Sequence, residues 1–345
     1  MARRAKKLED EKNQSVKFSE RVDDFINDAS GKIIDVGGAA KDAAKNAMNT
    51  VVAQLDANGD GRVGIEDVIV LAVKTPGVHI KRDVFLRNEL FKNHPQDVID
   101  KALQTTPALA GIPAEEIDKI ADEVIKRERW AVSGVSAALG APGGWAMAAT
   151  IPADIAQYYG YTLRAVQKLL YLYGFPEIDA DEEGLQLDSE TINTIIVCMG
   201  IMNGVAGANN AIKAMAKALA AGVEKQLLKT ALTKGTVYPI VKQVMKWFGV
   251  TLTKSLFAGA IRKAIPVVGG VVGGGITFAA FKPCCNRLKD ALKDTMLSNP
   301  KHVSSAEEES LFTGIMNGEV IDADFEDIST DEAHERIQNR EIDSD

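Results

Sequence analysis

The stretch IPADIAQYYGYTLRAVQKLLYLYGFP, residues 151–176, predicts one long helix and with it the class of the fold. Pro152 suits the first turn of a helix, where its missing N–H leaves no hydrogen bond unmade. Asp154 follows closely, where the helix dipole favours a negative charge. Gly174 and Pro176 are typical of a helix end, because glycine readily adopts left-handed backbone and proline cannot continue the helix.

Polar side chains recur along this helix at spacings of three and four residues, which places them on one face. They are Asp154, Gln157, Tyr161, Arg164 and Lys168. Two interpretations fit this pattern. The face is either the solvated side of an amphipathic helix, or the polar lining of a groove or lipid-headgroup site with Asp154 and Arg164 as its charged members.

Three runs without any charged residue overlap or follow the start of this helix, at 130–153, 191–212 and 264–281. Each approaches the length that a helix needs to cross a membrane. The first, however, is interrupted by GAPGG at 140–144, and the others contain several asparagines or glycines. Small residues let helix backbones approach closely, in a protein core as in lipid. The runs therefore fit closely packed buried helices or, alternatively, membrane-inserted hairpins or a peripheral membrane face.

Helical spacing of apolar residues continues through most of the chain, and alternating strand patterns are few. The stretches 94–103 and 112–130 each open with proline and acidic residues, which signals a helix start. We expect an all-α protein: a multi-helix domain of closely packed, Gly-rich helices, preceded by a separate helix–loop–helix. The predicted segments are a disordered basic N-terminus (1–20), a helical segment with the loop (21–78), the main helical domain (79–299) and a disordered acidic tail (300–345).

The predicted loop, DANGDGRVGIED at residues 56–67, follows the ligand pattern of an EF-hand calcium site. Such a loop needs oxygen ligands at positions 1, 3, 5, 7 and 12, and glycine at position 6, where the chain turns sharply. Gly61 stands at position 6, and apolar residues flank the loop on both sides. The predicted metal ligands are the side chains of Asp56, Asn58, Asp60 and Asp67 and the backbone carbonyl of Arg62.

Asp67 departs from the usual pattern, in which glutamate closes the loop. Aspartate is one methylene shorter, so we expect weaker binding of Ca²⁺ or better tolerance of Mg²⁺. The alternative, a surface turn rich in Asp, Asn and Gly, would have to match many fixed positions by chance. A second stretch, Asp179–Glu190, has acids and a glycine at suitable positions, but Gln186 replaces the apolar residue of position 8. It is either an acidic connecting loop or a second metal site.

Charge is unevenly distributed along the chain. The net charge is −8, yet the residues from Lys301 onward hold 14 acidic and three basic side chains, so the acidity belongs to the tail. A broad basic stripe interleaved with aromatic residues is missing from the sequence, which argues against nucleic-acid binding. Three cysteines, at 198, 284 and 285, form no disulfide framework or metal spacing and fit a reducing, cytoplasmic compartment. The four histidines are far apart, and no nucleotide-binding or nucleophile motif occurs.

Two stretches together resemble the EcsC protein family. They are GAPGGWAMAATIPADIAQYYGYTLRAVQKLLYLYGFPEI at 140–178 and IRKAIPVVGGVVGGGITFAAFKPCCNRLKDAL at 261–292, and the likeness covers about residues 80–295. The resemblance implies a helical protein for which membrane association is an option, and it implies no particular activity. The EF-hand loop lies outside the resembling region.

The favoured hypothesis is a non-enzymatic, calcium-responsive binding or regulatory protein, cytoplasmic or peripheral at a membrane. Its expected partners are a membrane surface or a membrane protein, and a homo-oligomer is an option. The alternative is a lipid-handling protein or a hydrolase-type enzyme with a pocket around the helix of residues 151–176. An integral membrane protein is the third option.

Overall fold

The computed structural model describes residues 64–73, 77–139, 151–178, 187–248 and 269–321. These residues are 71% helical and contain no strand, which confirms the all-α prediction. The helices are α3 (Ile65–Val73), α4 (Arg82–Leu90), α5 (Gln96–Gln104), α6 (Ala114–Leu139), α7 (Ile151–Leu172), α8 (Ser189–Asn203), α9 (Ala208–Ala220), α10 (Lys225–Thr233), α12 (Gly269–Lys293) and α13 (Ala306–Asn317). Residues 238–248, between α10 and α12, are helical as well.

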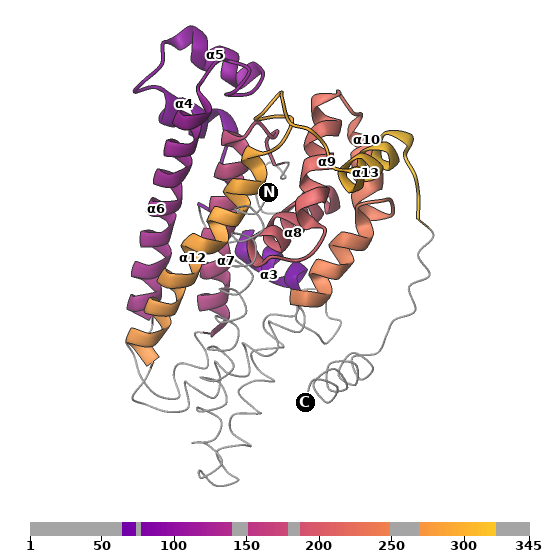
Figure 1. Cartoon of the computed structure of the whole chain (residues 1–345). Coiled ribbons are helices and arrows are strands. Elements are labelled where there is room, and N and C mark those ends of the chain that lie inside the picture. Colours follow the sequence, from indigo (N-terminus) through magenta and orange to yellow (C-terminus); the bar gives the residue numbers. More distant parts are fainter. Residues whose placement is uncertain (1–63, 74–76, 140–150, 179–186, 249–268, 322–345) are drawn as a thin grey trace, which may run out of the picture.

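The helices form two groups that share one core. Three long helices, α6, α7 and α12, lie side by side, with α4 and α5 at one end of α6 (Figure 1). The second group consists of α8, α9, α10 and α13, which pack on one another, and α12 contacts both α8 and α9. The short helix α3 packs against α7 and α8, so it lies where the two groups meet.

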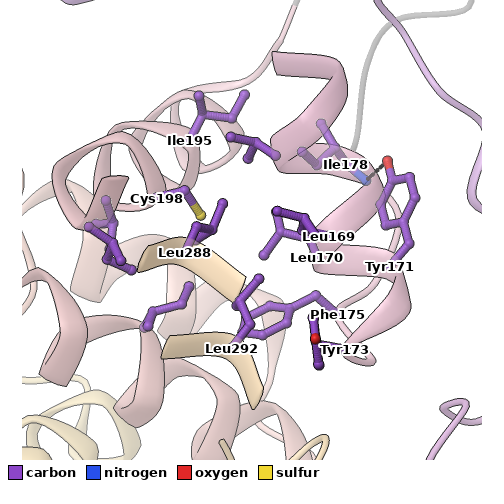
Figure 2. Packing of buried hydrophobic residues seen from close by; sticks show 14 of the residues in the cluster. Leu169, Leu170, Tyr171, Tyr173, Phe175, Ile178, Ile195, Cys198, Leu288 and Leu292 are labelled. Carbon is purple, nitrogen blue, oxygen red and sulfur yellow. Dashed lines mark hydrogen bonds between the residues drawn. The ribbon is translucent and has the colours of Figure 1, made fainter. Parts of the chain in front are cut away.

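The core is continuous across α7, α8 and α12. Cys198 of α8 and Leu288 of α12 gather with Leu169 of α7 in one apolar interior (Figure 2). Tyr171 is fully buried in the same region, and its hydroxyl accepts a hydrogen bond of 3.2 Å from the backbone N–H of Ile178. A buried tyrosine needs such a partner, because an unpaired hydroxyl would lose its hydration without compensation.

The uncharged run 191–212 forms most of α8 and the start of α9, and most of its apolar side chains are buried in this core. At Gly200 the neighbouring helix comes so close that an added Cβ would lie 2.5 Å from Val244. For this run the structure therefore favours the interpretation as closely packed buried helices. In the described part of the chain, no helix is long and apolar enough to cross a membrane. Residues 140–150 and 264–268 of the other two runs lie outside that part.

The end of α7 has the geometry that its glycine predicts. Gly174 has φ 93°, and the N–H of Phe175 donates to the carbonyl of Leu170 at 2.9 Å. The N–H of Gly174 also donates to Tyr171, so the last carbonyls of α7 are satisfied by a Schellman motif. The absent side chain leaves room for Thr106, whose Cγ2 would lie 2.8 Å from an added Cβ.

We expect Gly174→Ala to lower the free energy of unfolding by about 2–4 kcal/mol, because left-handed backbone strain of about 1–3 kcal/mol adds to the clash with Thr106. Gly111→Ala is the matched control, since Gly111 has φ 95° but nothing within 4 Å of an added Cβ. Urea unfolding of both variants measures the difference. Equal losses would show that crowding against Thr106 contributes nothing.

The structure describes residues 300–321, which the sequence assigned to a disordered tail. They include α13, which starts with a complete capping box between Ser305 and Glu308, and residues 322–345 lie outside the described part. The signal was present in the sequence as Ser-Ala-Glu-Glu at 305–308, followed by apolar residues at helical spacing. The high acid content of the segment instead favoured a prediction of disorder. Three of the acids, however, occupy the first turn of α13, where the helix dipole favours negative charge.

Candidate functional site

The predicted metal loop enters the described structure at its final residues. Gly64 precedes the first turn of α3, and Asp67 lies in that turn. The Asp67 side chain is only 2% exposed, and its Oδ2 accepts a hydrogen bond of 2.8 Å from the N–H of Gly64. The last predicted ligand is thus a buried carboxylate at a helix N-terminus, where backbone N–H groups and the helix dipole favour negative charge.

The closing position of an EF-hand loop lies at the start of the second helix of the helix–loop–helix, and Asp67 lies in the first turn of α3. Asp56, Asn58, Asp60 and Arg62 lie outside the described residues. Within the described ranges, no group of three or more His, Cys, Asp or Glu side chains is placed to hold a metal ion. The second stretch, Asp179–Glu190, also falls mostly outside them.

Helix α3 is part of the protein core. Ile65, Val68, Ile69 and Ala72 are fully buried, and α3 packs against α7 and α8. Burial of one aliphatic side chain of this size stabilises a fold by about 1.5–3 kcal/mol. A change in the loop that precedes α3 would therefore act directly on the core and not on a peripheral appendage.

The chain that follows α3 is attached to α7 by side chains of α7. The Gln167 amide is buried; it donates to the carbonyl of Val78 at 2.8 Å and accepts from the N–H of Ile80 at 2.9 Å. Arg164 donates to the carbonyl of Gly77. Residues 77–80 are thereby fixed to α7 through both backbone donors and acceptors, so α3 is held on both its packed face and its C-terminal side.

Two cations on the polar face of α7 pair with a carboxylate of α6. Glu128 of α6, only 3% exposed, accepts from Arg164 at 3.1 and 3.4 Å and from the ammonium group of Lys168. Lys168 is itself only 12% exposed at its side chain. The solvated-face interpretation is therefore wrong for these two cations, which neutralise a buried carboxylate. Gln157 and Tyr161 are half-buried, and the Asp154 side chain lies outside what the structure describes.

An internal cavity borders the same helix but is too small for a substrate. Its volume is about 10 Å³. That is room for roughly one water molecule. The residues that line it are Val73, Val78, His79, Leu163, Gln167, Ile178, Leu187 and Ile195. The cavity lining contains none of the four described members of the predicted groove lining, which are Gln157, Tyr161, Arg164 and Lys168.

A second polar cluster surrounds His302, which sequence spacing did not reveal. Its Nδ1 lies 2.9 Å from Asp294, its Nε2 lies 2.9 Å from Glu308, and the imidazole is 3% exposed. Lys213 of α9 also bonds to Asp294. Burial opposes ionisation of the Asp294 carboxyl, but hydrogen bonds from Lys213 and His302 outweigh it and hold the pKa of Asp294 below its ordinary value. The cluster joins α9, the end of α12 and α13. The carboxylates of Asp294 and Glu308 bond to opposite nitrogens of the imidazole, so they do not converge on one point where a metal ion could bind.

The cysteines lack the setting of a reactive nucleophile. Burial raises the pKa of Cys198 to about 12, and burial likewise raises the pKa of Cys284 and, more strongly, of Cys285. Because the thiolate is the reactive form, these thiols are inert near neutral pH.

Comparison with known protein families, with curated proteins and with solved structures finds no match. The resemblance to the EcsC family thus stays a prediction from the two quoted stretches.

Proposed function

We propose that this chain is a calcium-binding protein, with Mg²⁺ as an alternative ion, in which one EF-hand loop at residues 56–67 controls the docking of α3. The observation that carries the proposal is the placement of Asp67, a buried carboxylate in the first turn of a core helix. Calcium prefers carboxylate and carbonyl oxygens. Asp56, Asn58 and Asp60, the Arg62 carbonyl and Asp67 would hold the ion.

The role we propose is regulatory or binding and not catalytic. A bound cation would neutralise the acids of the loop and fix the residue at which α3 begins. Because α3 packs on α7, a change in the position of α3 would reach the core. The attachment of residues 77–80 to α7 supports this, because it fixes the chain on the C-terminal side of α3. The position of α3 then depends on the loop at its N-terminal side. We further propose a cytoplasmic location, with a membrane surface or a membrane protein as partner.

We expect calcium to raise the melting temperature of the full chain. At free calcium roughly 100-fold above Kd the added stability is about 2.7 kcal/mol, and a chelator should remove it. The variant Asp56→Asn/Asp60→Asn, which keeps side-chain shape but removes two ligand charges, should lose the calcium effect. Asp97→Asn/Glu123→Gln is the matched control, since both side chains are exposed on α5 and α6, and it should retain the full shift. Equal behaviour of the two variants would contradict the proposal.

A further inference from the structure

Residues 225–289 hold eleven lysines and arginines and no aspartate or glutamate. Within the described part of this range, five lysines lie on α10, on the turn after it and on the helix over residues 238–248. They are Lys225, Lys229, Lys234, Lys242 and Lys246, and we call this the basic helical pair. Lys229, Lys234 and Lys246 are exposed, and the part of the chain that the structure describes offers their ammonium groups no carboxylate. Exposed cations with no carboxylate nearby attract a polyanion.

The C-terminal end of the described chain is fixed beside these lysines. Val320 pairs with Gly235 in an antiparallel bridge, and the N–H of Ile321 donates to the carbonyl of Lys234 at 2.9 Å. In Figure 1 the segment after α13 runs close to α10. Ile321, the last residue that the structure describes, is therefore hydrogen-bonded to Lys234 itself.

The chain beyond this point has the opposite charge. Residues 322–345 contain ten aspartates and glutamates and two arginines. A 24-residue segment reaches up to about 80 Å when extended, whereas α10 and the helix over 238–248 are each only about 13–17 Å long. Tethering at one end also gives the segment a local concentration of about millimolar. We infer that the acidic segment 322–345 docks on the basic helical pair of its own chain. This inference is independent of the metal loop.

Carbodiimide crosslinking of the full chain tests this docking, because it joins lysine amines to carboxylates that are in contact. At about 0.01 M ionic strength, where charges act over about 30 Å, we expect crosslinks from Lys229, Lys234 and Lys246 to residues 322–345. At about 1 M, where the range is about 3 Å, they should be lost. Mixing isotopically light and heavy chains distinguishes crosslinks within one chain from crosslinks between two chains. Crosslinks within one chain support the inference, and crosslinks only between chains overturn it.

Trypsin cleavage at Arg336 and Arg340 gives a second readout. The variant Lys229→Gln/Lys234→Gln/Lys246→Gln should be cut there roughly tenfold faster than the native chain, as expected for about 1.4 kcal/mol of lost docking. Lys92→Gln/Lys101→Gln/Lys119→Gln is the control, since these lysines are exposed on other helices, and it should be cut at the native rate. Equal rates in both variants would overturn the inference. So would binding of phosphatidylserine vesicles to the same three lysines with no change in cleavage, because the surface would then belong to a membrane.

Discussion

Replacing Glu128 by leucine is expected to lower the free energy of unfolding by about 3–5 kcal/mol. Glu128 is the shared anion of Arg164 and Lys168, and its side chain is only 4% exposed. Its removal leaves two cations, one of them nearly buried, without a counter-ion, and this desolvation is not offset by the gain of one apolar side chain. Because Arg164 also holds Gly77, the loss should loosen the segment that follows α3.

Urea unfolding measures the effect, and Asp122→Asn is the matched control on the same helix. Asp122 is 56% exposed and pairs with Lys289, so water already solvates much of its carboxylate and its loss should cost less than the loss of Glu128. The triple variant Glu128→Leu/Arg164→Met/Lys168→Met removes all three charges together and should recover most of the loss. If Glu128→Leu is no worse than Asp122→Asn, the buried ion cluster does not stabilise the contact of α6 with α7.

Arg82→Ala is expected to be nearly as damaging, with a loss of about 3–4 kcal/mol. The Arg82 guanidinium donates to the carbonyls of Ala102, Leu103 and Thr105, at 3.3, 2.8 and 3.1 Å, and to that of Phe175 at 3.2 Å. It thereby satisfies carbonyls at the end of α5 and beyond the end of α7, which no helical N–H reaches.

Arg82→Lys should restore only part of this stability, because a single ammonium group cannot present the planar fork that reaches both helix ends. Arg87→Ala is the control from the same helix, since Arg87 forms an exposed pair with Asp100, 48% and 45% exposed, and its removal should cost about 1 kcal/mol or less. Thermal unfolding compares the three variants. Full rescue by lysine would mean that charge alone, and not the fork of hydrogen bonds, accounts for the role of Arg82.

Local signals in the sequence predicted the helices well. The Pro-acid starts at Pro95 and Pro113 mark the beginnings of α5 and α6, and Gly174 marks the end of α7. These signals are local, because capping and backbone sterics depend on a few neighbouring residues.

Contacts between distant segments could not be predicted in this way. Glu128 lies in a highly charged stretch and gave no sign of burial, yet it meets Arg164 and Lys168, 36 and 40 residues away. His302 meets Asp294 and Glu308, 8 and 6 residues away, in the turn between α12 and α13, and the local sequence contains no spacing pattern that marks this cluster. In the predicted metal loop, the sequence supplied the ligand order, and the structure adds that Asp67 is buried and that its helix belongs to the core.

The central claim is that one ion binds at residues 56–67 and acts through α3. Calorimetric titration of the full chain with calcium tests it most directly. The account predicts heat that fits a single site in the native chain and in Asp97→Asn/Glu123→Gln, and none in Asp56→Asn/Asp60→Asn. A native chain that releases no heat, or binding that survives in Asp56→Asn/Asp60→Asn, would contradict it.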